Sequence, residues 1–301
     1  MNFESQARTI LSPVTGFIAQ AGFTHSLTPA RNCTYGCTYC YVPTMHVFGG
    51  LKREDWERWG QFTTFKANAA DLLARELRPE QIIYCSPLVD PYQPVEAERL
   101  LMPQILEAVA KRPPRVFVVQ TRSSMILRDV TLLQRLSDRT RLRVSFSLTT
   151  NSESVRKVYE PHCQSFDERV AAIHTLTVAG IATHATLAPL LPCDPERLAD
   201  AALEATTRDL IGDPLHVRAT EADWRYYQGR ASNRSSTRPQ LGLSQHSRAK
   251  SFPESERSLC LVGEDSRLVR TGSRVSLSPE DSHVCPPLHS LVVVLKHGHA
   301  G

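Results

Sequence analysis

Short apolar runs alternate with longer amphipathic stretches between residues 23 and 220 of this 301-residue chain. The apolar runs have the length and the β-branched content of strands. We expect six strands, at residues 23–27, 82–85, 116–121, 142–148, 184–187 and 215–218. The amphipathic stretches predict five helices, at residues 68–78, 100–111, 129–136, 166–179 and 195–207. Strands that alternate with helices indicate a parallel sheet with right-handed crossovers, so we predict an α/β fold, a partial TIM barrel of the (β/α)6 type.

The repeat also divides the chain into three parts. Residues 1–22 are predicted to form an N-terminal extension, residues 23–220 the core barrel, and residues 221–301 an irregular tail. The tail is rich in Ser and Arg, and its large apolar residues show no helical period. We therefore expect the tail to be partly disordered and to lack the helix that would complete the barrel.

Charge and hydropathy argue against several classes of protein. Residues 1–220 hold 24 Lys and Arg against 23 Asp and Glu, so bulk charge gives little support for a nucleic-acid partner. No apolar run approaches the ~20 residues of a membrane span. Pro13 and Gly16 break the apolar stretch near the N-terminus, which therefore does not look like a signal peptide. The eight cysteines are irregularly spaced, and this predicts a reducing, cytoplasmic location rather than a disulfide framework.

Polar residues follow the predicted strands at the ends where an α/β barrel carries its chemistry. The first strand is followed by NCTYGCTYCY, and the second by VDPYQPVE. The third strand leads into TRS, the fourth closes on SLT, and the fifth closes on AP. These segments are expected to meet at one rim of the barrel.

Three cysteines lie within eight residues: Cys33, Cys37 and Cys40, with the spacing C-x3-C-x2-C. No further cysteine follows until Cys85, so the loop offers three thiolates rather than four. Thiolates are soft ligands that suit iron, and three of them can hold three irons of a cubane [4Fe–4S] cluster. The fourth iron would then be open to a small molecule. Gly36 eases the turn that brings the sulfurs toward one centre.

Two other interpretations of the cysteine loop stay open. A structural zinc ion accepts three cysteines and one histidine, and His25 or His46 could supply the fourth ligand. Zinc sites usually have two separated cysteine pairs, however, and the crowded triplet fits that pattern poorly. The cysteines could also be thiols that bind no metal, although a polar loop is an unusual place for buried, inert thiols.

Five segments carry a resemblance to a known family: NCTYGCTYCYVP, LVDPYQPVE, TRSSMILRD, VSFSLTT and TLAPLLP. Over about residues 20–220, the chain resembles the radical S-adenosylmethionine (radical SAM) superfamily, and most closely its spore photoproduct lyase-like branch. The resemblance implies a lyase-like enzyme whose [4Fe–4S] cluster cleaves S-adenosylmethionine (SAM) reductively, giving a 5′-deoxyadenosyl radical that abstracts hydrogen from a substrate. It also implies an electron donor such as flavodoxin or ferredoxin, and it makes DNA a candidate substrate by fold-level analogy.

The resemblance assigns roles to four residues. Tyr39, just before the third cysteine, is expected beside the adenine of SAM. Arg122 stands where relatives usually have Lys, and it is expected to meet the methionine carboxylate, which a planar guanidinium can grip with two bonds. Ser147 and Ala188 are expected to contact SAM from the fourth and fifth strands, Ala188 through its backbone.

Four further residues have weaker assignments. Asp90, Gln93 and Glu96 could hold the methionine amino group or the substrate, or they could be ordinary polar residues of a loop. Cys85 could return a hydrogen atom to a product radical, as a cysteine near this strand does in spore photoproduct lyases. A cysteine inside a strand is more often a small buried apolar residue, and we favour that interpretation.

The tail departs from the family pattern, because relatives usually continue past the sixth strand in a helix-rich segment. Two alternatives to the enzyme therefore remain at this point. One is a relative that binds the cluster but does not turn over because its C-terminal third is aberrant. The other is a non-catalytic module that binds structural zinc.

Overall fold

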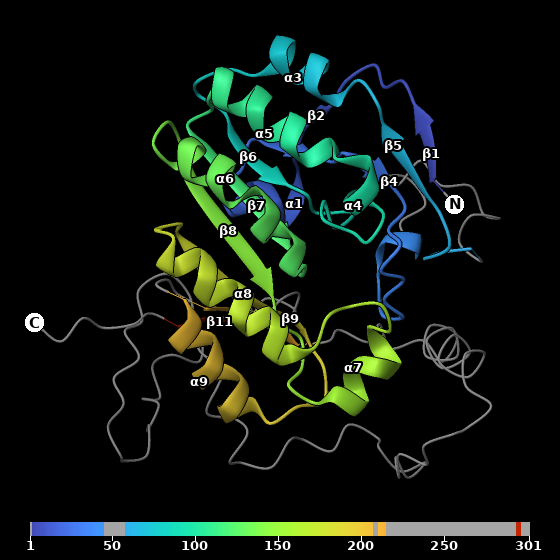
Figure 1. Cartoon of the computed structure of the whole chain (residues 1–301), viewed down its shortest axis with the longest axis vertical. Coiled ribbons are helices and arrows are strands. Elements are labelled where there is room, and N and C mark those ends of the chain that lie inside the picture. The colour runs from blue at the N-terminus through green and yellow to red at the C-terminus, as the bar shows by residue number, and fades with distance from the viewer. Residues whose placement is uncertain (1, 45–57, 207–209, 215–292, 296–301) are drawn as a thin grey trace, which may run out of the picture.

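The computed structural model describes residues 2–44, 58–206, 210–214 and 293–295. It has the α/β architecture that the alternating pattern predicts, with helices packed over one face of a mostly parallel sheet (Figure 1). The predicted tail, apart from three residues of a short strand, lies outside the described residues, and so does His46.

The larger sheet joins strands from the whole described chain. In the order in which they lie, its strands are β11 (Val293–Leu295), β10 (Leu210–Pro214), β9 (Thr183–Leu190), β8 (Arg141–Ser147), β7 (Val116–Thr121), β6 (Ile82–Cys85), β3 (His25–Leu27) and β2 (Leu11–Pro13). From β3 to β10 the strands are parallel, and each pairs with the next parallel strand along the chain. That sequential order is the order of strands in a (β/α) barrel. The edge strands β2 and β11 pair antiparallel.

Five helices connect the parallel strands and end within two residues of their predicted bounds. They are α3 (Ala69–Glu76), α5 (Leu101–Lys111), α6 (Val130–Ser137), α8 (Phe166–Val178) and α9 (Pro195–Ala205). Local chemistry fixes several of these ends. The side chains of Ser165 and Glu168 form a capping box at the start of α8, and Asp194 caps α9, whose first residue is a proline.

The sixth parallel strand begins before its predicted range. The predicted range, residues 215–218, lies outside the described residues, whereas the strand that pairs with β9 is β10, at Leu210–Pro214. Gly212, Asp213 and Pro214 are poor strand formers, so propensity hides this strand. The pairing of β10 with β9 identifies it as a strand, since Ile211 lies opposite Thr186.

A second, smaller sheet has no counterpart in the predicted pattern. It contains β1 (Asn2–Ser5), β5 (Thr63–Lys66) and β4 (Ala30–Arg31), with β5 in the middle. The remaining short elements are α1 (Gly16–Gln20), η1 (Val42–Thr44), α4 (Glu96–Arg99), η2 (Ser124–Asp129) and α7 (Glu153–Tyr159). Because β4 ends one residue before the cysteine loop, the small sheet fixes where that loop begins.

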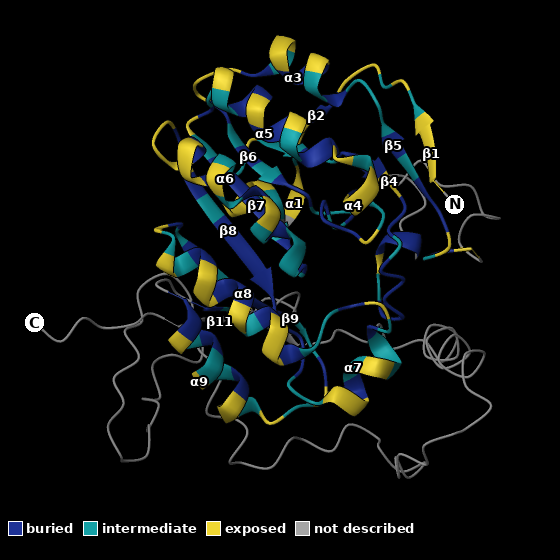
Figure 2. Ribbon diagram, viewed as in Figure 1, coloured by how far each residue is buried: buried dark blue, intermediate teal, exposed yellow. Residues whose placement is uncertain are grey.

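The core lies between the larger sheet and its helices (Figure 2). Strand β8 is buried without a break from Val144 to Ser147, as expected of a parallel strand covered on both faces. Phe117 on β7, Ile105 on α5 and Ile173 on α8 are each fully buried. Consecutive buried strands of this kind make a rigid base for the loops at their carboxyl ends.

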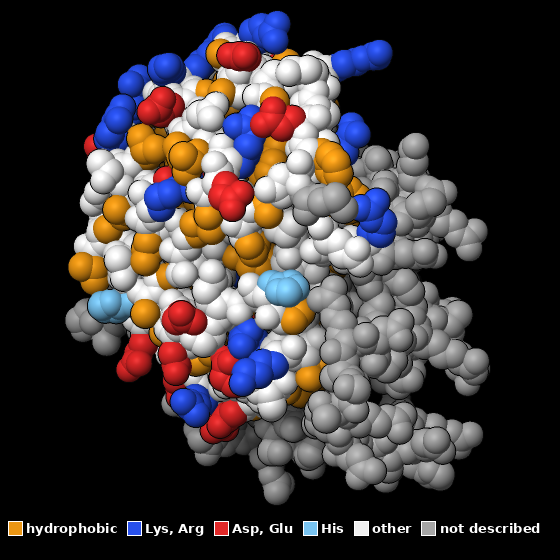
Figure 3. Space-filling model, turned by 45° about the vertical axis from the view of Figure 1, so that its right-hand side comes forward, with side chains coloured by type: hydrophobic (Ala, Val, Ile, Leu, Met, Phe, Trp, Pro, Cys, Tyr) orange, Lys and Arg blue, Asp and Glu red, His pale blue; other side chains and the backbone are white. Residues whose placement is uncertain are grey.

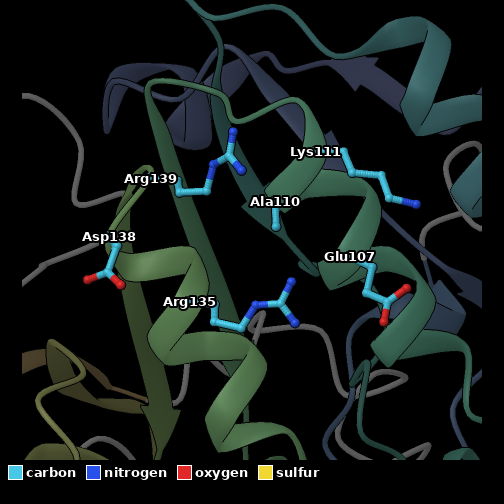
Figure 4. Close-up of a pocket in the computed structure, with 6 residues that line it drawn as sticks. All are labelled: Glu107, Ala110, Lys111, Arg135, Asp138 and Arg139. Atoms are coloured by element: carbon cyan, nitrogen blue, oxygen red, sulfur yellow. The ribbon is translucent and has the colours of Figure 1, made fainter.

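A cavity of about 440 Å³ lies between the carboxyl ends of α5 and α6 (Figure 4). Its lining includes Glu107, Lys111, Arg135 and Arg139. Lys111 directly precedes the segment that enters β7, and Arg139 the segment that enters β8, so the cavity lies at the amino ends of the strands. That end of an α/β barrel contributes stability rather than chemistry, and the candidate site is at the opposite end.

Candidate metal centre and active site

The cysteine loop follows β4 and coils tightly through two turns. The Gly36 amide donates to the Cys33 carbonyl, and the Cys40 amide donates to the Cys37 carbonyl. Both donor–acceptor distances are 3.2 Å. Cys33 and Cys37 are buried, and Cys40 is half-buried. Gly36 has a φ of +58°, and a Cβ there would lie 3.1 Å from the Cα of Gly60. Glycine is therefore needed at the point where the loop turns back on itself.

Gln93 holds the start of the loop rather than pointing at open space. Its Oε1 accepts hydrogen bonds from the Thr34 amide at 2.8 Å and the Thr34 hydroxyl at 3.1 Å. Its Nε2 donates to the hydroxyl of Thr63 at 3.3 Å, and that hydroxyl donates to the Asn32 carbonyl at 3.0 Å. The side-chain amide of Gln93 is thus occupied in joining β5 to the cysteine loop.

Arg122, at the carboxyl end of β7, reaches the cysteine loop. Its Nη1 donates to the Cys37 Sγ at 3.3 Å, to the Tyr39 hydroxyl at 2.5 Å and to Glu160 Oε1 at 2.6 Å. The Tyr39 hydroxyl in turn donates to the same Glu160 oxygen at 2.5 Å. One guanidinium therefore links a cluster-loop sulfur to a carboxylate that follows α7.

Glu160 is the centre of this network and is fully buried. The Thr149 hydroxyl donates to Oε1 at 2.7 Å, and Arg169 Nη1 lies 3.0 Å from Oε2. Burial alone would raise the pKa of Glu160, but Arg169 and Arg122, with hydrogen bonds from Tyr39 and Thr149, lower it to about 2. Glu160 is thus a permanently ionised carboxylate between two buried cations.

Cys163 is a second close neighbour of Cys37, beside Arg122. The two sulfurs and a Glu160 oxygen lie within 4.8 Å of one another. A hydrogen bond from Cys163 lowers the pKa of Cys37 against the effect of burial, and Arg122 lowers it further. Burial raises the pKa of Cys163. Of the two neighbouring sulfurs, Cys37 is the one that Arg122 contacts directly, at 3.3 Å.

The chemistry of the donors argues against a single ion at Cys37, Glu160 and Cys163. Glu160 Oε1 already accepts hydrogen bonds from Arg122, Tyr39 and Thr149, and Oε2 is paired with Arg169 at 3.0 Å, so two cations already engage this carboxylate. In the described part of the chain this is the only group of three such ligand atoms within 4.8 Å. The three loop cysteines are therefore more widely spaced than the ~3.8 Å that a zinc–sulfur distance of about 2.3 Å requires around one tetrahedral ion.

The loop itself fits a larger, sulfur-ligated group. It offers three thiols from one coil, which is the donor set of a cluster with one open iron. Two buried polar atoms of the same loop, Asn32 Nδ2 and Thr38 Oγ1, have no hydrogen-bond partner among the described residues. Buried polar atoms are normally satisfied, so unpaired ones in a cysteine loop favour a missing bound group.

Asp90 fastens the loop after β6 to the end of β7. Its Oδ1 accepts from the Thr121 hydroxyl at 2.7 Å and from the Tyr92 amide at 2.9 Å, and its Oδ2 accepts from the Arg122 amide at 2.8 Å. Burial raises the pKa of Asp90, while Arg122 and these hydrogen bonds oppose that rise. Its contacts hold Arg122 in place through the backbone.

Glu96 lies at the start of α4 and is also occupied. Its Oε1 accepts from the Met102 amide at 2.7 Å, in the first turn of α5, and from Arg128 Nη2 at 3.2 Å. The same guanidinium pairs with Asp129 at 2.9 Å. Glu96 therefore serves the join between α4, α5 and η2.

The other predicted residues lie in the larger sheet. Ser147, the last residue of β8, is buried and accepts a hydrogen bond from Gln120 Nε2 at 3.3 Å. Ala188 lies near the end of β9 and is half-buried. Cys85, the last residue of β6, is fully buried between Leu27 and Val119, and burial raises the pKa of its thiol.

Sequence reasoning missed Glu160, Arg169 and Cys163. Glu160 and Cys163 follow α7, a helix of seven residues that the apolar pattern does not reveal, and Arg169 lies in the predicted helix α8. One signal was present: the segment follows the fourth predicted strand, on the rim where Arg122 was expected. The backbone joins these places, since the Thr38 amide donates to the Tyr159 carbonyl at 2.9 Å.

Comparisons with known proteins identify the family and the fold. The family model of the radical SAM superfamily matches residues 27–203, a range that contains the cysteine loop, Arg122 and Glu160. The uncharacterized protein MJ0683 of Methanocaldococcus jannaschii is 29% identical over 160 residues, which are 53% of this chain and 58% of that protein. The uncharacterized protein Rv2578c of Mycobacterium tuberculosis is 26% identical over 217 residues, which are 67% of this chain and 62% of that protein. The matches thus span about three fifths of these relatives.

Solved structures share the fold. A spore photoproduct lyase mutant with bound AdoMet and dinucleoside spore photoproduct is similar with a TM-score of 0.54 at 18% identity, over 79% of this chain and 68% of that one. Spore photoproduct lyase complexed with dinucleoside spore photoproduct gives a TM-score of 0.52 at 17% identity, with the same coverage. Since the family model covers more than half of the sequence, the chain belongs to the radical SAM superfamily, whose members use a [4Fe–4S] cluster and SAM.

Proposed function

We propose that this protein is a radical SAM enzyme in which Cys33, Cys37 and Cys40 hold the cluster. The observation that carries the proposal is the position of these cysteines: one tight coil that follows β3 and β4, inside the matched range. When bound, the cluster and SAM supply one-electron cleavage of SAM to a 5′-deoxyadenosyl radical that abstracts hydrogen from the substrate.

Arg122 is suited to hold the methionine carboxylate. Within the described residues, all its side-chain hydrogen bonds come from Nη1, which leaves Nη2 available to a ligand. Its side chain is 16% exposed, so part of it can be reached from solvent. The guanidinium also lies over the Tyr39 ring, 5.8 Å from its centre, and the ring is the proposed neighbour of the adenine. Ser147 and Ala188 are proposed contacts from β8 and β9.

The carboxyl and amide groups after β6 are proposed to support the site rather than to touch SAM. Both carboxylate oxygens of Asp90, the amide oxygen of Gln93 and one carboxylate oxygen of Glu96 accept hydrogen bonds from neighbouring segments. Cys85 is proposed to be a packing residue, because it is fully buried in the sheet.

The partners follow from the chemistry. A reducing protein such as flavodoxin or ferredoxin would supply the electron, and a reducing cytoplasm would protect the cluster. DNA is the proposed substrate class, supported by the fold shared with a spore photoproduct lyase that binds a dinucleoside spore photoproduct. Of the helices in the described part of the chain, none combines the length and hydropathy needed to cross a bilayer.

Anaerobic reconstitution tests the proposal. The wild-type protein is expected to take up about four irons and four sulfides, turn brown and release 5′-deoxyadenosine from SAM under reducing conditions. Cys37→Ala is expected to lose both properties, whereas Cys193→Ala, a half-buried cysteine outside the loop, should keep them. Equal release from wild type and Cys37→Ala would overturn the assignment of the loop. A colourless, zinc-loaded wild type would favour the non-catalytic module, and a cluster without release would favour the inactive relative.

A further inference from the structure

Two polar groups lie close to the Cys37 sulfur. Arg122 Nη1 donates a hydrogen bond to it at a distance of 3.3 Å, and the Cys163 sulfur lies within 4.8 Å of it. A thiolate ligand of iron keeps further lone pairs, so both donors can act on Cys37 while it binds a cluster. Neither donor is one of the three cluster cysteines.

Arg122 is not free to swing away from this sulfur. Its Nη1 is tied to Glu160 at 2.6 Å, and its backbone amide is tied to Asp90 at 2.8 Å. Glu160 is itself fixed by Arg169, whose side chain is fully buried. Arg122, Glu160 and Arg169 together carry one net positive charge in a site that solvent screens poorly, and the Asp90 carboxyl, 4.0 Å from Arg122 Nε, partly offsets it.

We propose that Arg122 and Cys163 raise the reduction potential of the cluster through Cys37, and that Glu160 is the positioning residue that holds Arg122 there. The inference rests on the proposed function, because it requires Cys37 to be a cluster ligand. Reduction adds one electron from the donor protein to the [4Fe–4S]2+ state, giving [4Fe–4S]1+ with no proton transferred. Hydrogen bonds to ligand sulfurs and nearby positive charge stabilise the more negative state, and they are known determinants of cluster potential.

The arrangement gives Arg122 two tasks on two nitrogens. Nη1 acts on the cluster ligand, and Nη2 is the proposed contact for the methionine carboxylate.

The test is a redox titration of the reconstituted protein, followed by electron paramagnetic resonance, without SAM. Arg122→Gln keeps an amide donor but removes the charge, and it should shift the reduction equilibrium at least tenfold toward the oxidised cluster, ~59 mV for one electron. Cys163→Ala removes a donor and should shift it in the same direction by less. Cys163→Ser restores a donor of similar size and should return the potential to the wild-type value or above it. Cys193→Ala is the control and should match wild type.

The outcomes separate this inference from the proposed function. If wild type takes up no cluster, the proposed function fails. If the variants take up the cluster and keep the wild-type potential, the function stands and the inference is overturned. If Arg122→Gln takes up no cluster, the reduction potentials of Cys163→Ala and Cys163→Ser test the inference instead. Both of these variants leave the charged network intact. Equal potentials in that pair would overturn the role of Cys163.

Discussion

At the scale of single residues, the candidate site depends on a carboxylate that touches neither iron nor SAM in the proposed arrangement. Glu160 holds Arg122, Arg169 and Tyr39 in one buried cluster. Two buried guanidiniums without their shared carboxylate would repel each other and lack hydrogen-bond acceptors. Breaking such a buried network by removing one partner is costly, whereas an exposed ion pair contributes little.

Glu160→Gln should destabilise the cofactor-free protein by about 3–5 kcal/mol, because it leaves two buried cations without a counter-charge. The matched control is Glu153→Gln, which removes the charge from a carboxylate whose side chain is 46% exposed and 2.8 Å from Arg156. The control should cost less than about 1 kcal/mol. Urea unfolding measures both changes. Similar costs for the two variants would contradict the importance assigned to the buried network.

At the scale of secondary-structure elements, the sequence predicts those that repeat an apolar period. Strands β6 and β7 match their predicted bounds, and helix α8 differs from its prediction by one residue. Helix α7 was missed because its seven residues, ESVRKVY, present little apolar periodicity. The roles of Gln93 and Glu160 could not be predicted, because their hydrogen bonds join residues 59 and 121 positions apart. Sequence spacing fixes which loops share a rim, but not which side chains pair across it.

Gly36→Ala tests how strictly the cysteine loop must coil. The new Cβ would meet the Gly60 backbone at 3.1 Å and impose a positive φ on alanine, so iron uptake should fall well below that of wild type. Gly180→Ala is the matched control, because Gly180 also has a positive φ but nothing within 4 Å of the added atom. Both variants should lose about 1–2 kcal/mol to backbone strain, and only Gly36→Ala should lose iron as well. Iron analysis and urea unfolding separate the two effects. Wild-type iron content in Gly36→Ala would show that the loop tolerates the extra atom.

At the scale of the whole molecule, the order of the six parallel strands follows from the alternating pattern, but the edges of the sheets do not. Strand β1 pairs with β5, which lies some sixty residues later in the chain. Strand β10 was not predicted because its residues are poor strand formers. Basic side chains gather along one edge of the surface in Figure 3. Exposed arginines such as Arg75 and Lys residues such as Lys111 lie in the last turns of α3 and α5, where they stabilise the helix dipoles. Surface charge therefore follows the helix ends and gives no separate support for a DNA partner.

Acid should weaken the whole fold partly through Glu160. Its pKa is about 2 in the folded protein against an ordinary value of 4.5, so its contribution to stability is complete above pH 4.5 and is lost as pH falls from 4.5 toward 2. The difference in unfolding free energy between wild type and Glu160→Gln, which cannot titrate there, should narrow by roughly 2 kcal/mol between pH 7 and pH 3. Urea unfolding of the cofactor-free proteins at both pH values measures this difference. If the difference in unfolding free energy between the two proteins is the same at both pH values, the pKa of the Glu160 carboxyl is not lowered. The two arginines would then not hold this carboxyl ionised.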